Sequence, residues 1–594
     1  MMFGKIVNLH RALFVFSATI IMVAALYVGA GTVGLLDSDQ NSAHAQSADV
    51  QAWVTDRMNQ SGLLEREYPQ VDGQLTVFLS LSDGSSASSV AMGSGQDVQS
   101  AFAAALTQLA HMWNDSRGPQ WLKFDVVTSI EHAPGIDVKG IIPMTRSLQG
   151  LAINWDAGLA FLPEELVSYT LVDSDSELRL GNIRDYVDQR YAFQQPLEAL
   201  ENAATVKLEF FQTESYFVEA EAALPLYRGH RMIDNVTAEQ MVEAAIQGGE
   251  YLTAAVYPDG RFVYAYLPKS DSESDNYNMV RHAGTLYAMA ELYGHTQDPA
   301  LLDAIQRAIN YMLLTTVYCP GQTSGELFLC VVENDAVKLG GNALAVVALA
   351  EYTRNTGDDQ YMDVIYGLAG WIEDALLEDG SFVEKVFVST NEIDPIDSIY
   401  YPGEAILAMT RLHQVDGDGR WLDVAESAAQ YLILVRDASK ATEDLPHDHW
   451  LLYGMNDLYR ERPEDLYMDH AMRITQAITD RQNVDPIYDD WFGSFNQPPR
   501  STPTATRSEG LCAAYQLARD YDRPDDAERI MTTIQNAIRF QLQTQFQPES
   551  VMYLADPQRA LGGFHRSLTN FEIRNDYVQH NVSALLCTAR LLGE

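Results

Sequence analysis

The spacing of apolar residues along the chain changes near Thr237. Before this point, 75–83 (LTVFLSLSD) and 122–130 (LKFDVVTSI) have the short β-rich pattern typical of strands. Between them, 97–113 (DVQSAFAAALTQLAHMW) repeats its apolar positions at helical spacing, with Asp97 as a plausible N-cap. After Thr237 the helical spacing continues to the end. The pattern therefore predicts an α+β region followed by an all-α region.

A second stretch of the α+β region predicts a compact motif. Residues 150–166 (GLAINWDAGLAFLPEEL) read as two short strands that turn at Asp156–Gly158 and lead into a helix starting at Pro163. This stretch resembles the AMMECR1-like domain, in which a strand pair also leads into a Leu-Pro helix start. The resemblance covers fewer than twenty residues, and the α+β region shows no catalytic constellation.

The all-α region consists of two kinds of helical segment that alternate. Segments of the first kind are long and amphipathic: 237–256, 299–316, 358–377, 419–435, 464–478 and 525–542. Segments of the second kind are shorter and richer in small and apolar residues: 281–295, 340–357, 401–415, 449–462, 507–521 and 579–592. Short joints such as 355–360 (NTGDDQ) indicate helix-hairpin turns.

Six hairpins of this kind predict a closed ring. The amphipathic helices would form an outer layer with one wet face, and Gly284, Gly341, Gly403 and Gly510 would let the other helices crowd into an inner layer. The region resembles the (α/α)6 toroid of the six-hairpin glycosidase superfamily, in architecture more than in signature motifs. An open α-solenoid is the structural alternative. A closed ring requires 276–284 (NYNMVRHAG) to neighbour 575–581 (NDYVQHN).

The expected fold class is thus a multidomain chain, with an N-terminal α+β domain followed by an all-α (α/α)6 toroid of six helical hairpins. We expect a targeting segment plus linker over 1–47, the α+β domain over 48–232 and the toroid over 233–594.

The N-terminus has the features of a targeting segment. Lys5 and Arg11 precede an uncharged apolar run over 12–36, which suits either a membrane anchor or a signal peptide. An A-x-A cleavage site lies at 43–45. The positive charges precede the run, so we expect the folded part to be extracytoplasmic, either secreted or held by this segment, which would be its only link to a membrane.

Four cysteines are present. Cys319 and Cys330 bracket a loop-like segment rich in Gly, Pro and Ser. Because the folded part is expected to lie in an oxidising compartment, we predict a disulfide between them. Cys512 and Cys587 lie in apolar helical stretches and are expected to be buried thiols. No Cys/His spacing predicts a zinc site, and we expect neither a metal nor another cofactor.

The charge excludes some partners. With 82 acidic against 39 basic residues the net charge is −43, which repels nucleic acid and anionic lipid. No P-loop motif occurs that would cradle phosphates.

Candidate functional residues gather where the inner helices begin. The segments that lead from outer to inner helices are long, and long loops carry function. Three of them, 257–266, 377–387 and 561–568, read as a turn followed by an extended piece. The candidate catalytic residues are Asp490, Glu509, Asp576, Tyr577 and His580; the candidate substrate-binding residues are Tyr277, Arg281, His282, Lys338, Tyr401, Glu404, His449, Trp450, Asp489, Trp491, Arg507 and Arg566.

Such a mixed aromatic and charged lining is typical of sugar sites, and the superfamily resemblance also implies an oligo- or polysaccharide substrate. The basic residues near this mouth are Arg281, Lys338, Arg500, Arg507, Arg566 and Arg574. Two interpretations stay open: they bind an anionic sugar such as a uronate, or they neutralise local carboxylates.

Three functions stay open as well. Glycoside hydrolysis, the leading interpretation, requires two carboxyl groups, for which Asp490, Glu509, Asp576 and Glu404 are candidates. Sugar epimerisation or polysaccharide β-elimination would instead use groups such as His580, His282, Tyr577 and Arg507. A non-catalytic glycan-binding component of the envelope is the third.

Overall fold

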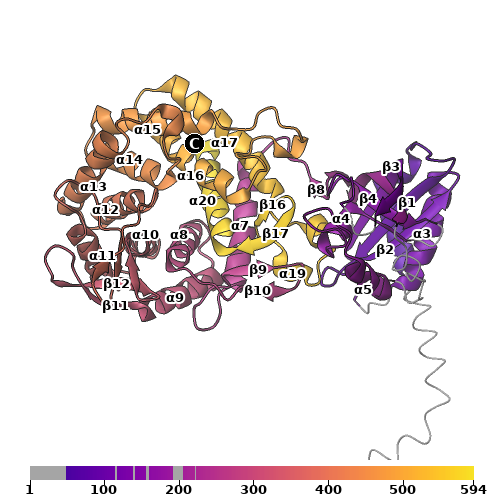
Figure 1. Cartoon of the computed structure of the whole chain (residues 1–594), viewed down its shortest axis with the longest axis horizontal. Helices are drawn as coiled ribbons and strands as arrows, with labels where there is room; N and C mark the ends of the chain where they lie inside the picture. Colours follow the sequence, from indigo (N-terminus) through magenta and orange to yellow (C-terminus); the bar gives the residue numbers. More distant parts are fainter. Residues whose placement is uncertain are drawn as a thin grey trace, which may run out of the picture.

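The computed structural model describes residues 49–113, 117–137, 141–155, 159–190, 205–220 and 222–593, which form a strand-bearing part and a ring of helices (Figure 1). The expected targeting segment and the turn at Asp156–Gly158 lie outside these residues. Within the described ranges, no helix combines the length and apolarity needed to cross a membrane. The boundary expected at 232–233 stays a prediction; β8 ends at Arg231 and α7 begins at Ala238.

The strand-bearing part is built on one eight-stranded antiparallel sheet with the order β2-β1-β3-β6-β4-β5, in which β7 pairs with β6 and β8 with β7. The strands are β1 (Leu75–Ser82), β2 (Ser89–Gly95), β3 (Trp121–Asp137), β4 (Gly150–Asn154), β5 (Leu159–Phe161), β6 (Thr205–Val218), β7 (Ala223–Tyr227) and β8 (His230–Arg231). The helices are η1 (Leu63–Glu65), α3 (Val98–Met112), α4 (Pro163–Ser168) and α5 (Leu180–Arg190).

These elements confirm the predicted strands and helices. The Asp97 side chain accepts a hydrogen bond of 2.8 Å from the Ser100 amide and so caps α3, and α4 begins at Pro163 directly after β4 and β5. The AMMECR1-like resemblance itself stays a prediction.

The two faces of the sheet pack against different partners. Because side chains alternate along a strand, Val77 and Leu79 of β1 face α3, whereas Phe78 belongs to a core on the other face. That second core includes Met552 and Tyr553 of the helical part. The strand-bearing part and the ring therefore share one hydrophobic core.

The helical part alternates outer and inner helices as predicted. The outer helices are α7 (Ala238–Ala254), α9 (Pro299–Leu314), α11 (Met362–Asp374), α13 (Arg420–Tyr431), α15 (Asp465–Thr479) and α17 (Pro524–Gln543). The inner helices are α8 (Met279–Thr296), α10 (Leu339–Thr356), α12 (Tyr401–Asp416), α14 (His449–Glu461), α16 (Ser501–Asp520) and α20 (Asn575–Gly593). Shorter helical turns are η2 (Leu432–Arg436), η3 (Thr442–Asp444), η4 (Asp489–Trp491), α18 (Pro548–Val551) and α19 (Pro557–Ala560).

The inner helices form a closed ring. Each packs against the next, and α20 packs against α8, so the predicted contact between the first and sixth hairpins is confirmed and the open solenoid is excluded (Figure 1). A Cβ at Gly284 would lie 2.8 Å from Gln579 of α20, and one at Gly403 would lie 2.7 Å from Asp448. The prediction for Gly341 was wrong: a Cβ there meets nothing closer than 4.0 Å, and the close approach falls one residue earlier, at Gly340.

Extended segments precede four of the inner helices, α8, α10, α12 and α20, and include strands in the three segments predicted to be extended. One sheet has the order β10-β9-β17-β16 and the other β11-β12-β13-β14-β15. Their strands are β9 (Ala265–Leu267), β10 (Ser272–Glu273), β11 (Thr316–Pro320), β12 (Leu327–Glu333), β13 (Ala336–Lys338), β14 (Lys385–Phe387), β15 (Glu392–Ile393), β16 (His565–Ser567) and β17 (Asn570–Arg574).

Two disulfides tie the ring. Cys319 and Cys330 are bonded across the β11–β12 hairpin, which confirms the prediction. Cys512 and Cys587 are buried, as predicted, but they also form a disulfide that was not predicted, because α16 and α20 are adjacent inner helices and bring the two Cα atoms to 6.4 Å. Helical periodicity alone does not show which residues of two distant helices meet.

The two disulfides are expected to differ in their contribution to stability. Cys512–Cys587 closes 75 residues and Cys319–Cys330 closes 11. Chain entropy gives about 4 kcal/mol for the first and about 3 kcal/mol for the second. Replacing Cys512 and Cys587 by serine should therefore lower the urea midpoint more than replacing Cys319 and Cys330. Equal midpoints for both double variants and the parent would contradict this, and mass spectrometry of the unreduced alkylated protein checks the pairing.

Candidate active site

A cavity of about 650 Å³ opens where the inner helices begin. All six inner helices, or the segments leading into them, contribute residues to the cavity lining. The contribution of α10 is a single residue within the helix, Leu344. The predicted site residues that line this cavity are Arg281, Tyr401, Glu404, His449, Trp450, Arg507, Arg566, Asp576, Tyr577 and His580.

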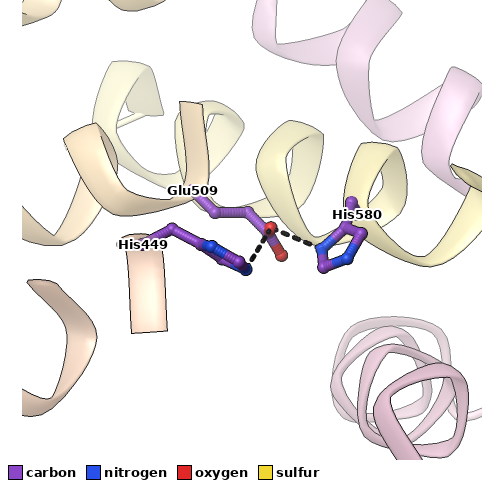
Figure 2. A group of neighbouring side chains, drawn as sticks. All are labelled: His449, Glu509 and His580. Carbon is purple, nitrogen blue, oxygen red and sulfur yellow. Dashed lines mark hydrogen bonds and ion pairs between the residues drawn. The ribbon is translucent and has the colours of Figure 1, made fainter. Parts of the chain in front are cut away.

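Three buried side chains from three inner helices meet beside this cavity. Glu509 of α16 lies between His449 of α14 and His580 of α20 (Figure 2). Its Oε2 is 2.8 Å from His580 Nδ1, a hydrogen bond, and 3.8 Å from His449 Nε2. The imidazole centroids are 5.2 Å apart with the rings at 79°. Both histidines line the cavity, whereas Glu509 lies behind them and is fully buried.

Burial sets the protonation of this cluster. It raises the pKa of Glu509 to about 7, an effect that the neighbouring His580 only partly offsets. It lowers the pKa of His449 well below its ordinary value, so this imidazole is neutral near pH 7. Neither ring nitrogen of His449 has a hydrogen-bond partner among the residues described. The cluster therefore holds a neutral imidazole whose two buried nitrogens make no hydrogen bond to the described residues, beside the Glu509 carboxyl group, whose pKa lies near neutrality and which is hydrogen-bonded to His580.

Asp576 is the carboxylate that two arginines hold in place. Arg574 binds it through two nitrogens, at 2.5 and 2.8 Å, and Arg281 of α8 binds it at 3.0 Å. Burial alone would raise the pKa of Asp576, but the hydrogen bonds and charge of Arg574, aided by Arg281, lower it overall. Asp576 is therefore ionised and neutralised. Tyr577 donates a hydrogen bond of 2.8 Å to Glu572.

Glu404 is a second carboxyl group of the cavity and has the opposite character. It is 3 % exposed, and its Oε2 has no partner among the described residues. Burial and the nearby carboxylates of Asp448 and Glu384 raise the pKa of Glu404 well above its ordinary value. Glu404 is thus a neutral acid at the cavity wall.

Three predicted residues lie elsewhere, in η4. The loop after α15 brings buried Asp490 to 3.0 Å from Arg228, in the turn between β7 and β8, and to 3.5 Å from His230, at the start of β8. Trp491 packs on Tyr488, and neither Trp491 nor Asp489 lines the cavity. Grouping Asp490 and Trp491 with His580 was wrong, because Asp490 pairs with groups of the strand-bearing part and Trp491 packs on Tyr488 of its own loop.

Three others face away from the cavity. His282 is fully buried, with Nε2 3.0 Å from the Ala308 carbonyl of α9 and Nδ1 2.7 Å from the Tyr277 hydroxyl. Tyr277 also accepts from the Phe262 amide at 3.0 Å. Lys338 forms an ion pair with Glu333. These side chains join inner helices to their surroundings and do not line the cavity.

Beyond the candidate catalytic and substrate-binding residues, the cavity contains His447, Tyr400 and Gln579, together with Arg574, one of the basic residues expected near this mouth. His447 accepts a hydrogen bond of 2.9 Å from Arg507 Nε. The signal for His447 is present in the sequence, since the polar and aromatic run 447–450 (HDHW) directly precedes an inner helix.

His449, Glu509 and His580 could also hold a divalent metal ion. Their candidate ligand atoms lie within 4.8 Å of one another, and imidazole with carboxylate is a common ligand set. A metal would have to replace the existing hydrogen bond between Glu509 and His580.

Comparisons with known proteins found similarity to solved structures only. No known family profile matches the chain, and no curated protein matches its sequence. Similar solved structures include an alpha-1,6-mannanase of Salegentibacter sp. HEL1_6 (13% identity, 59% of this chain and 99% of that chain, TM-score 0.43). Others are a D-mannose isomerase (12%, 60% and 97%, 0.44) and the cellobiose 2-epimerase from Bacillus thermoamylovorans B4167 (15%, 59% and 100%, 0.45). The closed ring of six helical hairpins is an (α/α)6 toroid fold. These similarities carry no conclusion about the family of the chain or its reaction.

Proposed function

We propose that the protein is a sugar isomerase or epimerase, which moves a proton at a carbon next to a sugar carbonyl. The observation that carries this proposal is the cluster of His449, Glu509 and His580 at the cavity wall. Proton transfer needs a neutral base within reach of the substrate and an acid that returns the proton. His449 fits the base, and the His580–Glu509 pair fits the acid.

The cavity lining supports a sugar as the substrate. Trp450, Tyr400 and Tyr401 offer aromatic surfaces, and Asn278, Gln579 and Ser398 offer groups that hydrogen-bond hydroxyls. The reaction needs no co-reactant. The base takes the proton α to the carbonyl, and an enediolate forms. Protonation of the same carbon gives the epimer; for isomerisation the hydroxyl proton first moves to the former carbonyl oxygen, and the acid then protonates the former carbonyl carbon. The base passes its proton back to the acid through solvent, which resets both groups.

The relative placement of the histidines bears on the product. With centroids 5.2 Å apart, the two rings touch edge to face and leave no room for a sugar carbon between them. Both therefore approach the substrate from one side of the cavity. This arrangement suits transfer between neighbouring carbons on one face, an aldose–ketose isomerisation, over inversion by two bases on opposite faces.

Hydrolysis is a second candidate, which the opposite protonation of Glu404 and Asp576 favours. Glu404 would be the acid and Asp576 the base, although the two arginines weaken Asp576 as a base.

The location we propose is extracytoplasmic, as two disulfides support.

Isotope exchange tests the first candidate. In D₂O, the protein should exchange the proton next to the carbonyl of a reactive sugar, as ¹H NMR of a panel of reducing mono- and disaccharides, including uronates, would show. Both His449→Ala and His580→Ala should slow exchange roughly 10²–10⁴-fold, because each removes an acid–base group. Asp490→Asn is the matched control and should exchange like the parent, since Asp490 lies outside the cavity. Full exchange in both histidine variants would exclude this role.

Glu404→Gln separates the two candidates. Glutamine keeps a neutral hydrogen-bond donor of the same shape but cannot supply a proton, so an isomerase should keep activity within about tenfold. A hydrolase that uses Glu404 as its acid should instead lose roughly 10²–10⁴-fold. The assay follows new reducing ends on an oligosaccharide panel alongside exchange; an unsaturated product absorbing in the ultraviolet would indicate a lyase.

Metal removal tests the remaining interpretation of the histidine cluster. If the cluster acts by acid–base transfer, dialysis against a chelator should leave the exchange rate unchanged, and added Zn²⁺ should inhibit by displacing the Glu509–His580 hydrogen bond. Loss of activity on chelation that Zn²⁺, Co²⁺ or Mn²⁺ restores would show that the ion takes part in the reaction.

A further inference from the structure

The basic residues at the cavity fall into two groups. Arg281 and Arg574 bind Asp576, and Lys338 binds Glu333, so these three neutralise local carboxylates. Arg500, Arg507 and Arg566 line the cavity, and no ion pair joins any of them to a carboxylate in the part of the chain that the structure describes. In a protein of net charge −43, three arginines without a carboxylate partner at one site need a separate explanation.

Arg507 carries most of this argument, because its hydrogen-bond partners are neutral groups. Its Nε donates to His447 Nδ1 at 2.9 Å, and its Nη1 donates to the Pro503 carbonyl at 2.8 Å and to Asn496 Oδ1 at 3.2 Å. The guanidinium lies 5.2 Å from the Phe495 ring centroid. These contacts fix the direction of the side chain and leave its charge uncompensated.

That charge persists at neutral pH. Burial, chiefly, lowers the pKa of Arg507 to about 10, so the guanidinium remains ionised. The same environment, with the charge of Arg507, lowers the pKa of His447 to about 4, so His447 accepts the hydrogen bond as a neutral imidazole. Keeping a partly buried charge without a counter-ion costs free energy, which an anionic ligand would recover.

The other two arginines extend the same surface. Arg500 is the N-cap residue of α16. Arg507 follows seven positions later, about two helical turns, so both residues lie on one face of the helix. Arg566 reaches the cavity from β16, an element far from α16 in the sequence. The three positive charges therefore belong to one cavity that also contains His449 and His580.

We infer that Arg500, Arg507 and Arg566 form a subsite for an oxyanion carried by the sugar substrate. This inference rests on the proposed function only in taking the ligand to be a sugar. A carboxylate, as in a uronic acid, pairs with a guanidinium through two parallel hydrogen bonds, and a sulfate ester presents the same kind of oxygen acceptors. Bound there, the anionic group would hold the sugar beside the two histidines.

Equilibrium titrations test the subsite separately from catalysis. Binding of D-glucuronate, D-glucose 6-sulfate and D-glucose is measured by calorimetry on the full chain. The parent should bind at least one anionic sugar roughly 10–100-fold more tightly than glucose, the scale of a charge-assisted bidentate pair. Arg507→Gln should lose that preference with its glucose affinity unchanged, and Arg507→Lys should keep part of it.

Arg539→Gln is the matched control. Arg539 also donates to a backbone carbonyl, that of Ile233 at 2.8 Å, and its guanidinium lies 4.8 Å from the Phe492 ring centroid, but it lies outside the cavity. This variant should bind like the parent, and near-ultraviolet circular dichroism checks that all variants are folded.

Each outcome has one meaning. A preference for glucuronate identifies a carboxylate subsite, and a preference for the sulfate ester alone identifies a sulfate subsite. No preference in the parent, or a preference that survives in Arg507→Gln, overturns the inference. Failure of the proposed reaction would appear instead as intact exchange in the histidine variants, so the two failures are distinguishable.

Discussion

The contact between α8 and α20 is the constraint on which the cavity depends. Asp576 at the start of α20 binds Arg281 of α8 and Arg574 of β17, and so joins the first hairpin of the ring to the last. Ring closure in turn places His580 beside Glu509 of α16 and His449 of α14. Asp576 also engages both Arg281 and Arg574, so the arginines of the cavity without a carboxylate partner among the described residues are Arg500, Arg507 and Arg566.

The protonation of each carboxyl group at the cavity thus depends on its environment and not on its residue type. Asp576 and Glu404 are both buried carboxyl groups, but arginines lower the pKa of the first, whereas burial, together with the nearby carboxyl groups of Asp448 and Glu384, raises the pKa of the second. Glu509 falls between them, because burial and His580 act in opposite directions on its pKa. Three carboxyl groups at one site can therefore have three different roles, a neutraliser, a hydrogen-bond donor and a proton-exchange partner.

Much of this architecture could be predicted from the sequence. The alternation of two kinds of helix, and the number of hairpins, were enough to predict a closed ring and the end of it that holds the site. Which face of an inner helix lines the cavity was not predictable. A helix such as α10 is buried on every side, so its apolar pattern does not distinguish one face from another. For this reason His282 was grouped with its neighbour Arg281, although one faces α9 and the other the cavity. Asp490 was misplaced for a different reason: its partner Arg228 lies in another part of the chain, and no local pattern shows that contact.

The shared core between the sheet and the ring has an evolutionary consequence. Met552 and Tyr553 leave the ring between α17 and α20 and pack on Phe78, Phe211 and their neighbours, and the Tyr553 hydroxyl donates to Ser80 at 2.8 Å. Fully buried Lys123 of β3 lies beneath the same tyrosine, 5.8 Å from its ring centroid. A recombination event that joined this ring to another partner would expose these apolar residues and leave the lysine without its cover. The two parts therefore cannot be exchanged as independent modules, and substitutions at their junction must be inherited together.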